Sequence, residues 1–200
     1  MLGSVGAPER RAGLREARRR EILAAAWALV REQGISALTL REVAARVGMR
    51  APSLYEYFPS KYAIYDAMFA EGYDAFLEIM PGTSDPSERR ARAVAWLLRF
   101  FAFCRADVAR YQLLFQPAIP GFHPSRESMG RAGRALSALD HELNAMGAGR
   151  QEARDMWTAL VTGMVNQQIA NDVAGNRWEG LAEEAVEMFM DHFVGLEGER

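Results

Sequence analysis

The side chains best suited to chemistry lie between Thr39 and Lys61, and they are suited to binding rather than to bond making. Basic, hydroxyl and aromatic groups follow one another there at short spacing. A guanidinium can bind a guanine edge through two hydrogen bonds, and an ammonium or hydroxyl group can bind a phosphate oxygen. We expect seven residues to contact nucleic acid: Thr39, Arg50, Ala51, Ser53, Tyr55, Tyr57 and Lys61.

These seven residues divide by the part of DNA they could reach. Arg50, Ala51 and Ser53 fall where a helix would enter the major groove, so we expect them at base edges. Tyr55 could contact a base, a thymine methyl group or a phosphate. We assign Thr39, Tyr57 and Lys61 to phosphates, and Lys61 is the only lysine among 24 basic residues. A lysine on the solvated surface is the alternative for Lys61.

Two short helices must position these groups, and Gly48 separates them. Thr39 can cap the first helix, with Glu42 three residues later to complete a capping box. One apolar face of this helix follows from the spacing of Leu40, Val43, Ala44 and Val47. Proline is tolerated in the first turn of the second helix, where Leu54 and Phe58 should pack inward. The pair is typical of a helix-turn-helix.

The same residues carry a family resemblance. The segment resembles the DNA-binding domain of the TetR family of bacterial transcriptional regulators, through Thr39, Val43, Ala44, Gly48, Leu54, Tyr55, Tyr57, Phe58 and Lys61. Relatives often carry histidine where this chain has Tyr57. The resemblance implies an all-α homodimer whose small N-terminal domain binds double-stranded DNA at a two-fold symmetric operator. It also implies a larger C-terminal domain that binds a small-molecule effector.

The charge of the chain is unevenly distributed. Residues 1–61 hold ten arginines and one lysine against six glutamates, a net charge of +5, whereas residues 62–200 carry a net charge of −7. A basic head on an acidic body suits a protein whose head alone faces DNA. Arginine-rich N-terminal tails are also common in other proteins.

Several classes of protein are disfavoured by the sequence. Cys104 is the only cysteine, and no window is long and apolar enough to span a membrane, so we expect a cytoplasmic protein without membrane contact. The three histidines are scattered, and no nucleophile elbow or phosphate loop is present. We therefore expect no cofactor, no metal and no enzyme, although a helical enzyme is a remote alternative.

We expect about nine helices in an all-α fold. Residues 1–14 should form a flexible basic arm, residues 15–61 the helix-turn-helix domain, and residues 62–200 the effector-binding and dimerisation domain. A helix over 60–80 should link the two domains, and the proline-rich and glycine-rich segment 81–86 is the expected hinge. Further helices are expected over 15–33, 87–105, 107–116, 125–146, 150–173 and 178–194.

Aromatic residues of the C-terminal domain could line an effector cavity, although such a stripe can equally be plain core. The candidates are Trp96, Arg99, Phe100, Phe103, Tyr111, Phe115, Trp157, Leu160, Met164 and Gln167. Arg99 could pair with an anionic ligand or with an acidic residue of the chain. The segment from Tyr111 to Ser125 resembles one subset of TetR regulators, which supports membership and does not identify the ligand.

The last two helices are the expected dimer interface, because two such pairs would form a four-helix bundle. The candidates are Val161, Val165, Ile169, Trp178, Ala185 and Phe189. The alternative is that both faces pack inside one subunit. We expect a repressor that a small apolar or aromatic effector releases from DNA. The alternative is a helix-turn-helix regulator without small-molecule control, either an activator or a protein-controlled regulator.

Overall fold

The computed structural model describes residues 7–80 and 88–194 of the chain. Over these ranges the fold is all-α, with nine α-helices and two short 3-10 turns, as the sequence predicted. The expected hinge at 81–86 and the first six residues of the expected arm lie outside the described residues. Within the described ranges, no helix is both long and apolar enough to cross a membrane.

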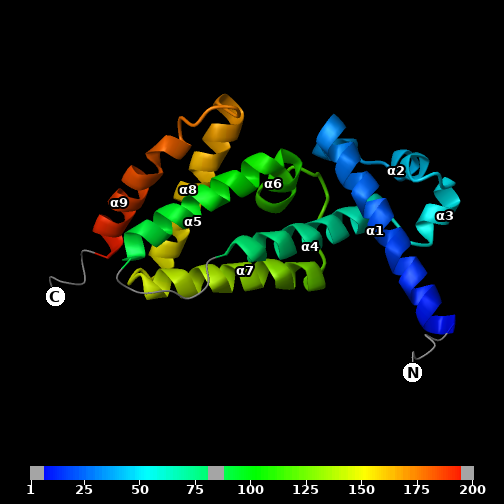
Figure 1. Cartoon of the computed structure of the whole chain (residues 1–200), viewed down its shortest axis with the longest axis horizontal. Helices are drawn as coiled ribbons and strands as arrows, with labels where there is room; N and C mark the ends of the chain where they lie inside the picture. Colours follow the sequence, from blue (N-terminus) through cyan, green and yellow to red (C-terminus); the bar gives the residue numbers. More distant parts are fainter. Residues whose placement is uncertain (1–6, 81–87, 195–200) are drawn as a thin grey trace, which may run out of the picture.

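The N-terminal head, at the end of the molecule where α1, α2 and α3 lie in Figure 1, is built from three helices and one 3-10 turn. They are α1 (Ala7–Gln33), η1 (Ile35–Ala37), α2 (Leu40–Arg46) and α3 (Ala51–Tyr55). The small core of this head is fully buried and includes Ile22, Leu29, Val43, Leu54 and Phe58. This packing explains the helical spacing of the apolar residues in α1 and α2.

Helix α1 begins at Ala7, eight residues before the predicted start, so the predicted arm is wrong for residues 7–14. The segment lacks an apolar stripe, and Leu14 is 72% exposed. Its alanines, arginines and glutamate are strong helix formers, however, and Pro8 lies in the first turn, where its missing N–H has no partner to lose. These residues form a helix without burying an apolar face. The hydrophobic periodicity of the sequence therefore could not reveal the helix.

The body contains the remaining six helices. They are α4 (Lys61–Ile79), α5 (Arg89–Ala106), α6 (Val108–Phe115), α7 (Arg126–Ala145), α8 (Gln151–Asn171) and α9 (Ala182–Phe193), the last preceded by η3 (Glu179–Leu181). Figure 1 shows α4 running out of the head and then lying beside α7, with α8 and α9 at the far end of the body. One helix thus belongs to both parts of the molecule.

Contacts along α4 hold the head and the body together. Trp27 of α1 donates its indole N–H to the Glu71 carboxylate at 3.0 Å. Farther along the chain, the backbone N–H and hydroxyl of Ser125 donate to Asp66 at 2.6 and 2.9 Å, which fixes the start of α7 on α4. Gly72 allows α4 to approach α6 closely, because a Cβ there would lie 2.9 Å from the Leu114 side chain. A displacement of α4 would therefore reach both domains.

Candidate nucleic-acid interface and internal cavity

Thr39 caps the start of α2 and Gly48 closes its end, as the sequence predicted. The predicted capping box is formed only in part, because the Glu42 carboxylate binds the Thr39 hydroxyl rather than the Thr39 backbone N–H. The Thr39 hydroxyl oxygen accepts a hydrogen bond from the Glu42 N–H at 3.2 Å and donates to the Glu42 carboxylate at 2.8 Å. At the other end, Gly48 has a φ of +64°. Its N–H bonds to the Ala45 carbonyl and the next N–H, from Met49, bonds to the Ala44 carbonyl. This pair of bonds closes the helix as a Schellman motif, for which glycine is the favoured residue.

Helix α3 is short, and buried side chains on its inner face hold it against the core of the head. Arg50 is its N-cap, and Pro52 lies in its first turn. Leu54 is fully buried, and Phe58, just after the helix, is 1% exposed. Because these two side chains face the core, the opposite face of α3 points outward into solvent.

All seven residues expected to contact nucleic acid are accessible. Ala51 and Tyr57 are half-buried, and the other five are exposed. Among the described residues, the side chains of Arg50, Ser53 and Tyr55 form no hydrogen bond or ion pair with the protein. Tyr55 is 53% exposed. These three groups are therefore free to bind a partner.

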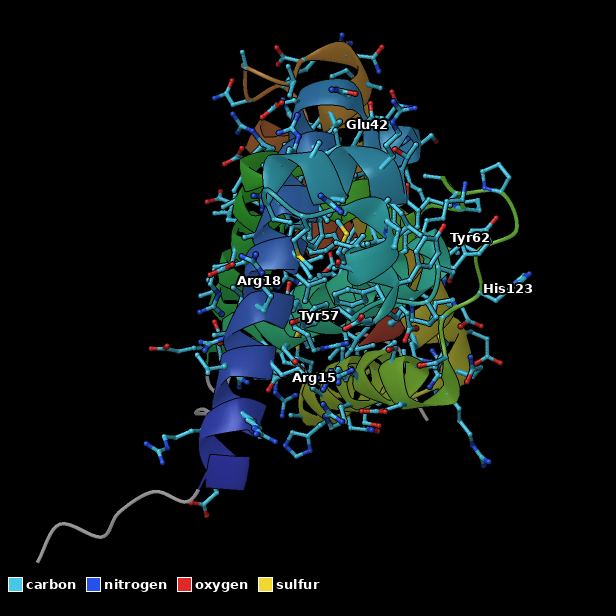
Figure 2. All side chains as sticks on the ribbon, turned by 90° about the vertical axis from the view of Figure 1, so that its right-hand side faces the viewer. Arg15, Arg18, Glu42, Tyr57, Tyr62 and His123 are labelled. Atoms are coloured by element: carbon cyan, nitrogen blue, oxygen red, sulfur yellow. The ribbon has the colours of Figure 1, made fainter. Side chains whose placement is uncertain are left out.

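Lys61 begins α4 directly after the Ser60 cap, whose hydroxyl accepts a hydrogen bond from the Ala63 N–H at 3.1 Å. Its ammonium lies 5.3 Å from the centre of the Tyr62 ring. The positive end of the helix dipole and the ammonium thus coincide, which favours an anion at this point. Figure 2 looks onto the head and labels Arg15, Arg18, Glu42, Tyr57 and the Tyr62 that follows Lys61.

Two arginines of α1 have a bracing role that the sequence did not reveal. Arg15 donates to the Glu56 carbonyl at 2.8 Å, and its guanidinium lies 5.6 Å from the Tyr57 ring centre. Arg19 donates to the Tyr57 carbonyl at 2.7 Å and lies 4.3 Å from the Phe58 ring. They bind carbonyl groups just after α3 and so fix its orientation. Their positions on a separate helix, about 40 residues earlier in the chain, gave no local signal.

An apolar cavity of about 170 Å³ lies in the body between α4, α5, α7 and α8. Of the ten predicted ligand residues, Trp96, Phe100 and Phe115 line it. The other lining residues are Tyr73, Phe76, Met80, Ala132, Ala135, Leu136, Leu139, Thr158, Val161 and Thr162. The contributions of α4 and α7 were missed, although Ala132, Ala135, Leu136 and Leu139 have the spacing of one apolar helix face.

The other seven predicted ligand residues do not line this cavity. Trp157 borders a smaller void beside it, and Tyr111 lines an open groove between α6 and α8. Phe103 and Met164 are buried in the core, and Leu160 packs against it. Arg99 and Gln167 are exposed. Arg99 forms no ion pair among the described residues, so the structure does not support its pairing with an acidic residue of the chain.

The smaller void has charged walls. It measures about 10 Å³ and is bordered by Trp157, Arg92 and Glu142, among others. Arg92 pairs with Glu142 at 2.5 Å, with only 13% and 9% of the two side chains exposed. The sequence contains a signal for this pair, because Glu142 falls on the apolar face of α7, three residues after Leu139 and seven after Ala135.

The structure contradicts four of the six predicted dimer-interface residues. Val161, Val165, Ala185 and Phe189 are buried inside the subunit, while Ile169 and Trp178 are half-buried. The cause is that α8 and α9 pack on α5 and on each other. The Phe189 ring, for example, lies 4.8 Å from that of Trp157. The alternative, that these faces pack within one subunit, is correct for these four residues.

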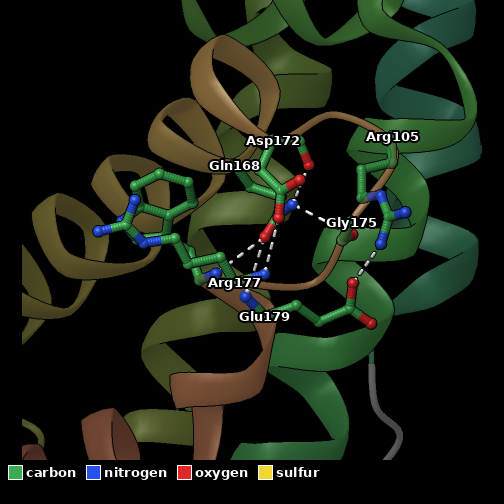
Figure 3. A network of polar contacts seen from close by, with 7 residues as sticks. Arg105, Gln168, Asp172, Gly175, Arg177 and Glu179 are labelled. Atoms are coloured by element: carbon green, nitrogen blue, oxygen red, sulfur yellow. Dashed lines mark hydrogen bonds and ion pairs between the residues drawn. The ribbon is translucent and has the colours of Figure 1, made fainter.

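A buried glutamine fixes the corner between α8 and α9 (Figure 3). Gln168 is fully buried. Its amide oxygen accepts hydrogen bonds from the N–H groups of Trp178 and Glu179 at 2.9 and 3.1 Å, and its NH₂ donates to the Asp172 and Gly175 carbonyls. Arg105 of α5 pairs with Glu179 in the same network. The relative position of the last two helices is therefore set by polar contacts as well as by the core.

Across the part of the chain that the structure describes, no group of three or more His, Cys, Asp or Glu side chains is arranged to hold a metal ion. The sole cysteine, Cys104, is fully buried. Burial raises the pKa of its thiol well above the usual range, which keeps the sulfur protonated and unreactive near neutral pH.

The head is similar in sequence to known proteins, and most of the chain is similar to known proteins in fold. The model of the family described as bacterial regulatory proteins, tetR family, matches residues 22–68. The HTH-type transcriptional activator FasR of Mycolicibacterium smegmatis is 30% identical over 103 residues, which cover 51% of this chain and 47% of FasR. The HTH-type transcriptional repressor KstR2 of Mycobacterium tuberculosis is 34% identical over 85 residues, or 40% of this chain and 42% of KstR2. The chain thus aligns with less than half of the length of these curated relatives.

Solved structures agree over most of the length. The putative regulatory protein SCO4313 has a TM-score of 0.73 at 19% identity, covering 90% of this chain and 98% of that one, which shows a shared fold. AmtR of Mycobacterium smegmatis has a TM-score of 0.60 at 26% identity, covering 86% of this chain and 85% of AmtR. The head thus matches the tetR family of bacterial regulatory proteins in sequence over residues 22–68, and most of the chain shares its fold with SCO4313 and AmtR.

Proposed function

We propose that the chain is a DNA-binding transcriptional repressor that acts as a homodimer and is released from its operator by a small effector. The observation that carries this proposal is the set of free donors on α3. Arg50, Ser53 and Tyr55 are exposed and unpaired among the described residues, while the arginines of α1 hold the end of the helix in place. A rigid helix that presents unused donors is suited to base edges in the major groove.

Phosphate contacts would set the register of the head on DNA. Thr39 at the start of α2 and Lys61 at the start of α4 are exposed near the two ends of the helix-turn-helix. Backbone N–H groups at helix starts and an ammonium bind phosphate without reading sequence. The net charge of +5 on residues 1–61 adds attraction that depends on salt.

The dimer would form through the exposed faces of α8 and α9 rather than through the four predicted residues that are buried inside the subunit. Met156, Gly163 and Ala170 of α8 are exposed and follow one another at intervals of seven residues. Leu181 and Met188 near α9 are 45% and 61% exposed and have the same spacing. A spacing of seven keeps side chains on one helix face, and a second copy of the chain would cover these apolar residues in a four-helix bundle.

Helix α4 connects the cavity to the DNA-binding surface. Tyr73, Phe76 and Met80 at its end line the cavity, while Lys61 begins it in the head. With nineteen residues the helix is about 28 Å long, so a small tilt at the cavity becomes a larger displacement at α3. In a two-fold dimer the recognition helices must lie roughly 34 Å apart to reach successive major grooves. An effector that favours another spacing would therefore release the DNA.

The direction of regulation is part of the proposal. Of the two matched relatives, FasR is named an activator and KstR2 a repressor. Because α4 borders the cavity, an effector bound there would displace the DNA-binding head and release the protein from DNA. Release by an effector is the way in which a repressor is controlled. Because both relatives are named as transcription regulators, they also support the prediction that the chain is not an enzyme.

The test is to incubate the purified protein with fragmented DNA from its source and to sequence what it retains at two salt concentrations. Recovery of a two-fold symmetric motif at both concentrations is the expected result. Retention without any motif, lost at the higher salt concentration, would contradict base reading and leave only a basic surface. Induction of the adjacent genes when the chain is deleted would establish repression, and their loss of expression would indicate activation instead.

A further inference from the structure

The 170 Å³ cavity and the 10 Å³ void lie side by side, and their linings together indicate which kind of ligand would fit. Met80, Trp96 and Leu139 border both spaces. The larger space is lined almost entirely by apolar and aromatic residues, whereas the smaller one is bordered by Arg92, Glu142 and Trp157 among others. A molecule that fills the first would have one end directed toward the second.

Two tryptophans that border the smaller space have indole N–H groups without a good acceptor. Trp157 is 1% exposed, and its Nε1 has no hydrogen-bond partner among the described residues. The Nε1 of Trp96 donates only to the Met80 thioether at 3.4 Å, and sulfur is a weak acceptor. A buried N–H without an acceptor is costly. An oxygen acceptor that reaches this point would remove that cost.

The charges beside these donors already cancel. Arg92 and Glu142 pair at 2.5 Å with little of either side chain exposed. A ligand carboxylate would bring a second negative charge close to Glu142 in a poorly solvated space, which is unfavourable. A neutral acceptor, such as a ketone or ester oxygen, does not meet this repulsion.

The volume limits the size of the ligand. A closed apolar cavity of about 150 Å³ is enough to bind benzene, so about 170 Å³ accommodates one ring with a small substituent. Ring faces and edges for such a ligand are offered by Phe76, Phe100 and Phe115, whose centroids lie 5.3 to 5.8 Å from one another.

We infer that this cavity binds a neutral, single-ring compound with a carbonyl-type acceptor, which accepts a hydrogen bond from the indole N–H of Trp157. The inference rests on the proposed function in one respect, namely that the cavity is the effector site. Its chemistry can be measured without DNA.

The experiment is calorimetric titration of the full-length protein with acetophenone, with ethylbenzene of nearly the same shape, and with benzoate. We expect acetophenone to bind at least tenfold more tightly than benzoate. In Trp157→Phe, the ratio of acetophenone to ethylbenzene affinity should fall about fivefold, the usual effect of one neutral hydrogen bond. Equal ratios in the wild type and this variant, or tighter binding of benzoate by the wild type, would overturn the inference.

Further variants keep the test valid if Trp157→Phe does not fold. Glu142→Gln removes the competing carboxylate, so benzoate should bind at least fivefold more tightly while acetophenone changes little. Ala135→Leu fills the cavity and should abolish binding of all three probes. Ala95→Leu makes the same change on the exposed side of α5 and should leave binding unaltered. The inference is wrong if Ala135→Leu binds acetophenone as the wild type does.

Outcomes with DNA separate this inference from the proposed function. If no probe binds while the protein retains its operator, the ligand class is wrong and DNA binding stands. If acetophenone binds as expected and the operator affinity does not change, the ligand class is supported and effector control through this cavity is contradicted.

Discussion

Arg31, near the end of α1, forms an ion pair with Asp107, the residue that caps α6. Its Nη2 lies 2.6 Å and its Nε 3.0 Å from the Oδ2 atom of Asp107. The other oxygen of the same carboxylate accepts the Arg110 N–H at 3.1 Å. One buried carboxylate thus joins the DNA-binding head to the body and also begins a helix of the body.

The two partners of this pair should contribute unequally to stability. Asp107→Ala removes the cap of α6 and the acceptor for Arg31, and we expect it to lower the free energy of unfolding by about 1–3 kcal/mol. The Arg31 side chain is 53% exposed, so Arg31→Ala should cost less than about 1 kcal/mol. Urea denaturation of both variants measures these values. A larger loss for Arg31→Ala would contradict the assigned roles.

The Gln168 network predicts a strong effect from one amide. Gln168→Leu leaves the N–H groups of Trp178 and Glu179 without their acceptor inside the protein, and we expect a loss of about 2–4 kcal/mol in the free energy of unfolding. The neighbouring exposed Gln167 provides the matched control, because Gln167→Leu should change stability by less than about 0.5 kcal/mol. Equal effects of the two variants would show that the network does not stabilise the corner.

The fold of the head was predictable because its signals are local. The Thr39 cap, the glycine at Gly48 and the apolar spacing around Leu54 each act within one helical turn. The start of α1 was missed because its first turns form without burial. The bracing by Arg15 and Arg19 was missed because it joins residues about 40 positions apart in the chain, and no local pattern encodes such contacts.

The cavity was only partly predictable for a similar reason. Aromatic residues of α5 and α6 were identified by type, but residue type does not distinguish a cavity wall from plain core, as Trp96 and Phe103 show. The sequence showed that α8 and α9 carry apolar residues that need a partner to cover them. Which side another helix of the same subunit covers depends on the position of α5, so Val165 and Phe189 were assigned to the wrong partner.

The free energy of unfolding should depend on pH through Tyr73, which lines the cavity. Burial raises the pKa of Tyr73 to about 12, from an ordinary value of 10.0. The unfolded chain therefore loses this proton first, so the stabilising difference is full below about pH 10 and is lost as the pH rises toward 12. At pH 11 the loss is about 1.4 kcal/mol. Urea denaturation at pH 9 and 11 should show a smaller loss for Tyr73→Phe than for the wild type. Identical losses would contradict the prediction.

The proposed dimer face can be tested with a pair of methionines. Met188→Glu places a charge on the exposed side of α9 and should dissociate the dimer in sedimentation experiments, because an unpaired charge is costly in an apolar interface. Met129 of α7 is 49% exposed but lies away from α8 and α9, so Met129→Glu is the control and should leave the mass unchanged. A dimer that persists in Met188→Glu would contradict this interface.

Two substitutions in the head should weaken DNA binding in different ways, and the first concerns Lys61. Lys61→Ala removes a proposed phosphate contact, so affinity should fall similarly for specific and random DNA. The slope of log affinity against log salt should become shallower by about 1. Arg126, at the start of α7 and outside the head, is exposed. Arg126→Ala removes a positive charge there and should change neither the affinity nor the salt slope. A loss confined to specific DNA would show that Lys61 reads bases.

Arg50→Ala should instead change which sequence is preferred. The free guanidinium at the N-cap of α3 can form two hydrogen bonds to a guanine edge, so its loss should cost about 1–3 kcal/mol on the specific operator and relax selection at one base position in each half-site. Binding to random DNA should fall much less, because the phosphate contacts remain. Sequencing of DNA selected by the wild type and the variant measures this directly. If the variant loses affinity equally for both kinds of DNA and selects the same motif, Arg50 contacts the DNA backbone and base reading must rest on Ser53 and Tyr55.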